Sequence, residues 1–487
     1  MLPELEKFYT AATDDPVRFA FSGRTPMMPR QEKQFVTEEE RLAIWQRIEQ
    51  SPPNPGKRVV YVNIPFCVNH CLYCGFFRNR YSPEKSAEYV ELLIREIARE
   101  AHQPYIDGAP IHALYLGGGT PSALETPHLV RLLHHLRTQL PLAADCEITV
   151  EGRVLNFDDD KVDACFDCGV NRLSIGIQSF DTRVRQQQGR RMSGEDAAEF
   201  IAKLLRRDRG TVILDLMYGL PWQTPEVWQR DLETCLELAP DGIDVYALKR
   251  IPGTPLDKAI TNEKIPPTST LAEQGALYQQ ATTTLQRAGW RQISNSHWAR
   301  TPRERNLYNL LIKAGAECLA FGSGAGGSIE PYSYGIATDI SHYIAEVARG
   351  RKPLGLMTVA DAAQPLRDFI MGSVEIGRLD LRELSNRLPQ ALGQHPLVLR
   401  LIERWLAAGL AERHDDCLLL TTAGRFWAPN LIGGLQGVCA HLLASELVEP
   451  DGGDCCGCGN CSGGGRGGCA SPTGSARVHR LLTSSSP

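Results

Sequence analysis

The chain of 487 residues is long enough for two or three domains, and its 43% hydrophobic and 22% charged residues are ordinary for a globular protein. A formal net charge of −5 offers no electrostatic footprint for nucleic acid, so we expect no nucleic-acid partner. The first residues lack a basic segment followed by an apolar one, and no stretch reaches the apolar length of a membrane span. We therefore expect a cytoplasmic protein without a membrane partner, whose 15 cysteines are free thiols or metal ligands.

Residues 1–57 are rich in proline and charge, and we interpret them as an N-terminal extension that wraps a domain, with one helix near 38–50. From Arg58 onward, short apolar runs alternate with amphipathic segments, which is typical of an α/β fold with a parallel sheet. Ser82 and Pro83 form a good start for the first helix of this region. Strands are predicted at 58–64, 113–117, 146–151, 171–177, 211–217 and 243–248, and further helices near 126–139, 158–168, 194–207 and 225–238.

The second half of the chain divides into a segment at 251–357, which we expect to flank the substrate, and a smaller, mostly helical C-terminal domain at 358–448. A strand pair is predicted near 417–427, and 380–427 has a winged-helix-like pattern that we assign to packing or substrate covering. Residues 449–487 form a flexible tail rich in glycine and cysteine. The cysteines at 455, 456, 458, 461 and 469 could bind a second metal or carry iron, or be incidental thiols of a disordered tail.

Three cysteines, Cys67, Cys71 and Cys74, follow the first predicted strand at a C-x3-C-x2-C spacing. Such crowding in a chain without a secretory signal indicates metal ligands and not disulfides. A structural zinc site needs four ligands, which His70 or another cysteine could complete, whereas an iron–sulfur cluster held by three cysteines leaves one iron open.

With Tyr73 before the third cysteine, Phe76 and Phe77 after it, and YVNIPFC leading into it, the stretch resembles the radical S-adenosylmethionine (SAM) superfamily. The resemblance implies a partial (β/α)6 TIM-like barrel at 58–250, with the active site at the carboxyl ends of its strands. It also implies a [4Fe–4S] cluster on the three cysteines. The open iron of that cluster binds SAM, whose reductive cleavage gives a 5′-deoxyadenosyl radical.

The resemblance also assigns the SAM contacts. Glycines after the second strand let the backbone approach a ligand closely, although such a turn alone is weak evidence of a ligand site. A satisfied hydrogen bond inside the barrel remains the alternative for Gln178 and Asp215, and Arg191 could replace Arg190 if the register differs by one. The expected SAM-binding residues are Gly118, Gly119, Thr120, Glu151, Gln178, Arg190 and Asp215.

The preceding YVNIPFC resembles the branch that contains oxygen-independent coproporphyrinogen III oxidase, heme chaperones and the heme-degrading methyltransferases called anaerobilin synthases. Phe76 stands where the oxidase has an additional cysteine, and residues 305–309 lack the histidine and tryptophan of the chaperone motif. The glycine-rich 321–328, the segment around His297 and the tail resemble the methyltransferases more.

The function expected from this resemblance is anaerobic heme degradation, in which the porphyrin is C-methylated and opened to a linear tetrapyrrole with release of iron. A reducing partner such as flavodoxin is implied. His297 could bind heme iron or move a proton, and Trp298 could contact a porphyrin, although a hydrogen-bonding role for the histidine is an equal alternative. The alternative functions are oxygen-independent coproporphyrinogen III oxidation and heme binding or trafficking without turnover.

Overall fold

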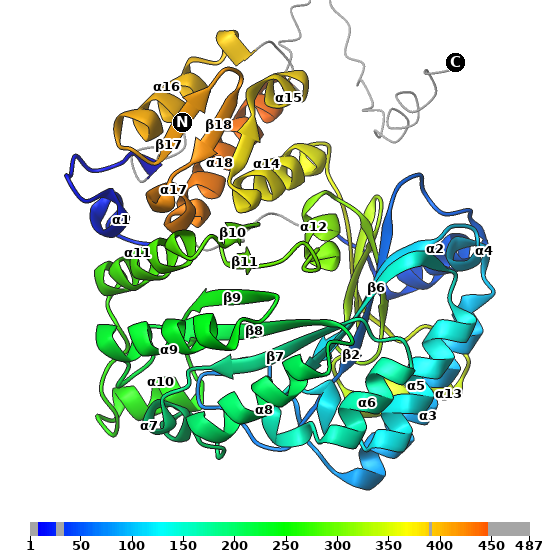
Figure 1. Ribbon diagram of the computed structural model, residues 1–487. Coiled ribbons are helices and arrows are strands. Elements are labelled where there is room, and N and C mark those ends of the chain that lie inside the picture. The colour runs from blue at the N-terminus through cyan, green and yellow to red at the C-terminus, as the bar shows by residue number, and fades with distance from the viewer. Residues whose placement is uncertain (1–7, 26–33, 389–391, 447–487) are drawn as a thin grey trace, which may run out of the picture. The chain divides into compact units, whose positions relative to one another are not determined.

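The computed structural model describes residues 8–25, 34–388 and 392–446, and its centre is a run of parallel strands (Figure 1). Each of these strands is hydrogen-bonded to the one before it in the chain, which gives the sheet order β2-β5-β6-β7-β8-β9. The predicted α/β barrel is therefore confirmed. The strands are β2 (Arg58–Ile64), β5 (Ile111–Gly118), β6 (Leu142–Gly152), β7 (Arg172–Gln178), β8 (Thr211–Tyr218) and β9 (Gly242–Ala247).

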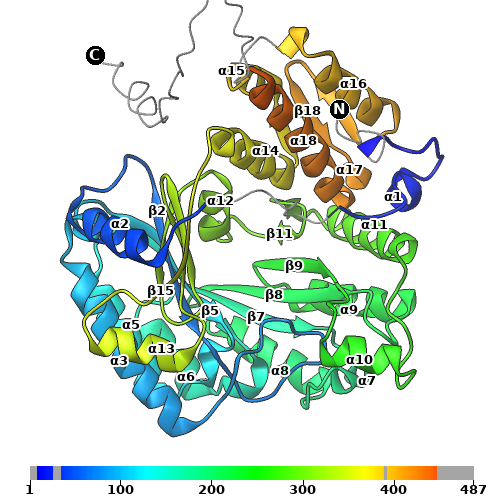
Figure 2. The same cartoon turned by 180° about the vertical axis from the view of Figure 1, so that it is seen from behind.

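The helices that connect these strands lie along one face of the sheet, as Figures 1 and 2 show from opposite sides. The first begins as predicted, because the Ser82 side chain accepts a hydrogen bond from the Lys85 amide and Pro83 occupies the first turn. The main connecting helices are α3 (Pro83–Ala101), α5 (Thr126–Gln139), α6 (Asp159–Asp167), α8 (Gly194–Arg206) and α9 (Pro225–Leu238).

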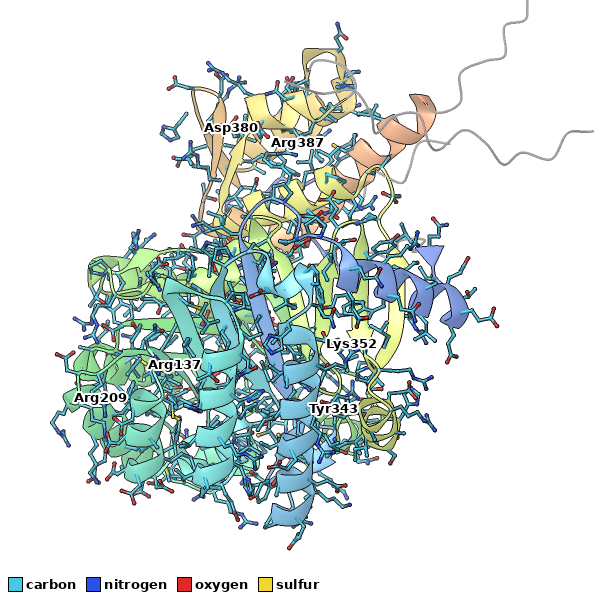
Figure 3. The ribbon with its side chains drawn as sticks, turned by 90° about the vertical axis from the view of Figure 1, so that its right-hand side faces the viewer. Arg137, Arg209, Tyr343, Lys352, Asp380 and Arg387 are labelled. Atoms are coloured by element: carbon cyan, nitrogen blue, oxygen red, sulfur yellow. The ribbon has the colours of Figure 1, made fainter. Side chains whose placement is uncertain are left out.

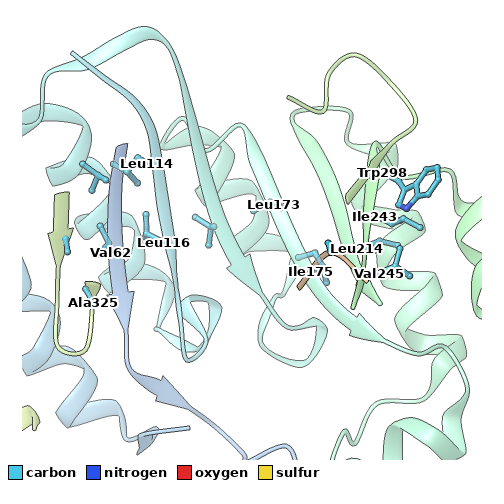
Figure 4. Packing of buried hydrophobic residues seen from close by; sticks show 14 of the residues in the cluster. Val62, Leu114, Leu116, Leu173, Ile175, Leu214, Ile243, Val245, Trp298 and Ala325 are labelled. Atoms are coloured by element: carbon cyan, nitrogen blue, oxygen red, sulfur yellow. The ribbon is translucent and has the colours of Figure 1, made fainter. Parts of the chain in front are cut away.

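Alternation of side chains along the strands separates an apolar core from a polar barrel interior. Leu114, Leu173, Leu214 and Ile243 are each fully buried in one continuous cluster, part of which Figure 4 shows. Burying such side chains stabilises the fold by about 1.5–3 kcal/mol each. The opposite face of the strands carries tyrosines and carboxylates, and this face forms the site described below.

The sequence did not reveal how the sheet continues beyond these strands. β12 (Glu317–Phe321) adds parallel to β2, and the antiparallel strands β13 (Gly326–Ile329), β14 (Tyr332–Ile336) and β15 (Leu354–Val359) follow it. On the other edge, β11 (His297–Ala299) pairs antiparallel with β9, and β10 (Arg291–Gln292) pairs with β11. The glycine-rich 321–328 covers the last residue of β12, the turn at 322–325 and the first residues of β13.

A buried ion cluster joins this added sheet to α3. The Lys352 ammonium lies 2.9 Å from both Glu96 and Glu100, and the Tyr343 hydroxyl of α13 (Ile340–Ala348) donates to Glu96 across 2.7 Å. Lys352 and Tyr343 are labelled beside α3 in Figure 3. Because Lys352 has two carboxylate partners, its buried charge is compensated.

The C-terminal region is mostly helical, as predicted, and contains a small antiparallel sheet in the order β16-β18-β17. The prediction of a strand pair within 417–427 is wrong, because only its first part is a strand and its partner precedes it. Thr421 caps a helix that occupies the rest. The elements are α14 (Gln364–Ile376), β16 (Arg378–Asp380), α15 (Leu381–Asn386), α16 (Pro396–Ala407), β17 (Ala411–His414), β18 (Cys417–Leu420), α17 (Thr422–Phe426) and α18 (Ala428–Glu446).

The N-terminal extension contacts both the sheet and the C-terminal region. Its strand β1 (Gln34–Phe35) pairs with β15, and Trp45 of α2 (Glu38–Gln50) packs on Tyr334. Further upstream, the Pro16 carbonyl accepts a hydrogen bond from the Trp427 indole across 2.9 Å. The boundaries near 57, 250, 357 and 448 stay proposals, and the cysteine-rich tail lies outside the described residues. No helix in the described residues is long and apolar enough to cross a membrane.

Candidate active site

The cysteine loop leaves β2 and folds back over the carboxyl end of the barrel. Cys67 and Cys71 are buried and Cys74 is partly exposed, and all three are free thiols. Burial raises the pKa of the Cys67 thiol, the Thr120 hydroxyl and Arg153 lower it, and the neighbouring Cys74 and Cys71 raise it. A cluster of positively charged iron would reverse this effect and favour the thiolates.

Backbone contacts fix the shape of this loop. The Cys74 amide donates to the Cys71 carbonyl across 3.1 Å, and His70 Nε2 lies 3.0 Å from the Cys74 carbonyl oxygen. The imidazole also stacks on Phe77, with ring centroids 4.3 Å apart. In the described residues, no three histidine, cysteine or acidic side chains converge as ligands of a single ion. Because His70 is engaged within the loop, it is a poor candidate for the fourth ligand that a structural zinc site would need.

The glycine turn at the end of β5 lies against this loop. A Cβ on Gly118 would lie 1.9 Å from the Asn63 side-chain oxygen, and one on Gly119 would lie 2.6 Å from the Phe66 carbonyl oxygen. Gly118 also has a φ of +107°, which side chains disfavour. Thr120, which follows, is buried with its hydroxyl 3.4 Å from the Cys67 sulfur. The turn therefore holds bare backbone next to the cluster loop.

Glu151 lies beneath the same turn and is held by two donors. Its carboxylate accepts from the Tyr115 hydroxyl across 2.8 Å and from the Gly118 amide across 3.2 Å. Burial raises the pKa of Glu151, and these hydrogen bonds oppose that change. Because a carboxylate has about four acceptor positions, two donors leave it free to accept from a ligand.

Gln178 and Arg190 carry buried polar atoms that have no partner in the protein. The Gln178 side-chain oxygen and the Arg190 Nε are both buried and unpaired. The rest of the Arg190 guanidinium is oriented by the Gly176 carbonyl across 2.5 Å and the Tyr73 hydroxyl across 3.1 Å. Buried polar groups without partners are costly unless a ligand satisfies them. Arg190 is 7% exposed and belongs to this interior, whereas Arg191 is exposed.

Asp215 completes the interior set. It accepts from the Ser174 hydroxyl across 3.1 Å, and its register partner on β9 is Asp244. Burial, the charge of Asp244 and the charge of Glu151 raise the pKa of Asp215 to about 7. The barrel therefore places several carboxyl groups in a poorly solvated space beside the glycine turn, where a ligand with amino and hydroxyl groups would satisfy them.

His297 is enclosed between two carboxylates and is 1% exposed. Its Nδ1 lies 3.0 Å from Asp244 and its Nε2 lies 3.0 Å from Glu304. Burial alone lowers the pKa of His297, but Asp244 and Glu304 outweigh it and raise the pKa to about 9. Burial likewise raises the pKa of Glu304, but Arg172 and His297 outweigh it and lower the pKa to about 2. Since both ring nitrogens face carboxylates, this geometry favours a charged, structural histidine over an iron ligand.

Trp298 lies on the other face of β11 from this histidine. It is 1% exposed and packs in the apolar core beside Ile243, as Figure 4 shows. The structure thus brings together the predicted triad, turn and strand-end residues, and it separates Trp298 from them.

Two interior residues, Tyr115 and Asp244, were not predicted from the sequence. Asp244 had a usable signal, because a carboxylate inside the apolar strand GIDVYA is as unusual as Asp215 is in TVILDLMY. Tyr115 had none, since a tyrosine in a strand is ordinary.

Comparison with known proteins decides the family. The model of the radical SAM superfamily matches residues 61–235. An anaerobilin synthase of Escherichia coli O157:H7 is 46% identical over 430 residues, which is 88% of this chain and 95% of that protein. The chain belongs to the radical SAM superfamily. As a radical SAM enzyme it uses a [4Fe–4S] cluster and SAM, and the unpaired Gln178 and Arg190 atoms fit such a ligand.

Two other similar proteins place this radical SAM chain among its relatives. The heme chaperone HemW of Escherichia coli K12 is 33% identical over 275 residues, covering 55% of this chain and 70% of that protein. The solved structure of coproporphyrinogen III oxidase (HemN) from Escherichia coli aligns with a TM-score of 0.70 and 24% identity, over 84% of this chain and 97% of that chain. This structural likeness confirms the fold.

Proposed function

We propose that the chain is a radical SAM enzyme of anaerobic heme degradation, which C-methylates the porphyrin and opens it to a linear tetrapyrrole with release of iron. The observation that carries this proposal is the 46% identity to an anaerobilin synthase over 95% of that protein's length. Phe76, which stands where the oxidase has a further cysteine, is 75% exposed beside the cluster loop. It offers the cluster no additional thiol.

We assign the cofactors to the residues described above. Cys67, Cys71 and Cys74 would hold the cluster, and the bare backbone of Gly118 and Gly119 would meet the methionyl part of SAM, with Thr120 packed behind it. The side chains that would bind the polar groups of SAM are Glu151, Gln178, Arg190 and Asp215. When bound, the reduced cluster and SAM supply radical chemistry that begins with cleavage of the sulfonium.

The roles of the individual side chains follow from their chemistry. The planar Arg190 guanidinium, already oriented by Tyr73, suits bidentate contact with a carboxylate. Glu151 can accept from an ammonium group with the lone pairs that Tyr115 and Gly118 leave free. Asp215, whose pKa is raised to about 7, can accept or donate a hydrogen bond near neutral pH. These residues orient the cofactor and exclude water from it.

Space for a substrate is available beside this interior. A cavity of about 340 Å³ adjoins Asp244 and Tyr246 of β9. That size falls within the roughly 300–1,000 Å³ typical of small-molecule sites. Tyr246 is 42% exposed, and it presents an aromatic surface suited to one part of a tetrapyrrole.

We further propose a small reducing partner of the flavodoxin type and a location in the cytoplasm. The ten cysteines of the described residues are all free thiols, which suits a reducing compartment. This partner would reduce the cluster.

Anaerobic turnover tests the proposed function. Reconstituted protein with heme, SAM and a reductant should lose the heme absorbance and give a methylated linear tetrapyrrole, identified by its mass. Cys71→Ala protein is the control for cluster-independent bleaching. Intact heme alongside normal SAM cleavage would contradict the substrate assignment. Parallel reactions with coproporphyrinogen III would reveal the oxidase activity, and stoichiometric heme binding without product would favour trafficking.

A further inference from the structure

The cavity beside β9 collects basic side chains from three distant parts of the chain. Arg24 comes from the N-terminal extension, Lys249 follows β9, and Arg425 belongs to α17. The cavity lies at the carboxyl end of its barrel strand, and Asp244 in its wall is the register partner of Asp215. It therefore adjoins the interior to which we assign SAM.

The acidic side chains of this cavity already have partners. Asp244 pairs with His297 at 3.0 Å, and Glu375 pairs with Lys313 at 3.4 Å. Within the described ranges, Arg24, Lys249 and Arg425 form no ion pair with any carboxylate. The cavity thus has three uncompensated positive charges, which favour an anionic ligand.

Neutral groups hold the two arginines in place. Arg24 donates to the Phe426 carbonyl across 3.0 Å and lies over the Phe426 ring at 4.3 Å, while its buried Nε has no partner. Arg425 donates to the Ile376 carbonyl across 3.0 Å. These contacts orient both guanidinium groups without neutralising them, and the unpaired Nε of Arg24 is a donor that a bound oxygen could satisfy.

The remaining wall is apolar and aromatic. Phe426, Pro429 and Ile432 line the cavity on the side of the C-terminal helices, opposite the strand residue Tyr246. Such a lining suits a flat, apolar ring system, and the surrounding cations suit carboxylates attached to the ring.

We propose that Arg24, Lys249 and Arg425 bind the propionate carboxylates of the tetrapyrrole and so direct its ring toward the barrel interior. This inference rests on the proposed function and deepens it, because it gives the N-terminal extension a part in substrate recognition. Charge-assisted hydrogen bonds to a carboxylate contribute about a tenfold gain in affinity or more.

Esterification of the ligand tests this proposal without changing the protein. Cluster-loaded protein without reductant is titrated anaerobically with heme and with heme dimethyl ester in one buffer, and binding is followed by absorbance. Wild-type protein should bind the ester about tenfold more weakly or worse. The Arg24→Met/Lys249→Met variant, which keeps Arg425, should bind heme more weakly than wild type does and lose less affinity on esterification than wild type does. Lys203→Met, which removes an exposed lysine of α8 outside the cavity, should behave as wild type.

The outcomes separate this inference from the proposed function. Equal binding of heme and its ester by wild-type protein would overturn the carboxylate contacts even if heme is turned over. The same conclusion would follow if a folded double variant kept the full wild-type penalty for esterification. Wild-type protein that binds neither heme, its ester nor coproporphyrin would overturn both. Because heme and its ester are compared in wild-type protein, this comparison tests the proposal even if the variant misfolds.

Discussion

Asp215 and Asp244 are direct register partners on the parallel strands β8 and β9, so two carboxyl groups stand side by side inside the barrel. The charge of Asp244 is compensated by His297, whose Nδ1 lies 3.0 Å from the Asp244 carboxylate. Asp215 accepts a hydrogen bond from the Ser174 hydroxyl, and burial together with the charges of Asp244 and Glu151 raises the pKa of Asp215 to about 7. The protein without SAM therefore carries an acid that resists ionisation at the place assigned to the cofactor.

Asp215→Asn should stabilise the protein without SAM at neutral pH while weakening SAM binding. A raised carboxyl pKa means that the folded state binds more protons than the unfolded state between about pH 4 and 7, so wild-type stability falls as pH rises through that window. Removing the acid should raise the free energy of unfolding at pH 8 by about 2–4 kcal/mol relative to pH 4. Denaturant unfolding at several pH values measures this. Asp107→Asn, at an exposed position of α4 (Pro104–Asp107), is the control, and parallel curves for Asp215→Asn and wild type would contradict the expectation.

His297 gives a pH dependence of the same direction in a higher window, because its folded-state pKa is raised as well. Its pKa is raised to about 9, so its stabilising charge is fully present below about pH 6.5 and is lost as pH rises through 9. His297→Gln should remove this loss and cost about 3–5 kcal/mol at pH 6, because Asp244 and Glu304 then lose a buried cation. Thermal unfolding from pH 6 to 10 would detect both effects. If His297 instead served heme iron, the variant would keep its stability and lose the heme spectrum.

Gly118→Ala should destabilise the protein and abolish measurable SAM binding. The new methyl group would lie 1.9 Å from the Asn63 side-chain oxygen at a φ of +107°, so it meets both a clash and a disfavoured backbone. Gly56 offers a matched control, because its φ is +127° and nothing lies within 4 Å of the position that a Cβ would occupy. Gly56→Ala should therefore cost only the backbone strain, about 1–3 kcal/mol, and leave SAM binding unchanged. Equal SAM binding by the two variants in equilibrium dialysis would argue against the turn as a cofactor contact.

Much of the barrel could be predicted because its strands are short apolar runs separated by amphipathic helices, and Ser82 and Pro83 mark a helix start by local chemistry alone. The strands added at the edges of the sheet could not be predicted, since β12 (Glu317–Phe321), for example, is recognisable only by its parallel pairing with Arg58–Ile64. In the site, Gln178 and Asp215 were assigned through the resemblance to the superfamily, with a satisfied hydrogen bond inside the barrel as the alternative. The pairing of His297 with Glu304 depends on tertiary contacts between segments whose spacing carries no signal.

Variants of Arg190 and its neighbour Arg191 test which of the two arginines binds the carboxylate of SAM. Arg190 is 7% exposed and oriented by Tyr73, whereas Arg191 is exposed. Arg190→Lys keeps the charge but loses the planar fork, so SAM binding should weaken about tenfold or more. Arg191→Lys should bind SAM as wild type does. A loss confined to Arg191→Lys would instead mean that the cofactor carboxylate meets the second arginine.

Cys71→Ala tests the ligands of the cluster most directly. Because three thiolates are the least that can hold a site-differentiated cluster, loss of one should lower the iron content of anaerobically reconstituted protein from about four atoms per chain to about none. The brown absorbance should disappear with it. Cys417→Ala, which removes a partly exposed thiol of β18 in the C-terminal sheet, should keep both iron and colour. The tail cysteines remain in both variants. Iron retained by Cys71→Ala at the wild-type level would therefore locate the cluster elsewhere. A small remaining iron content without cluster absorbance would indicate only weak iron binding by the tail.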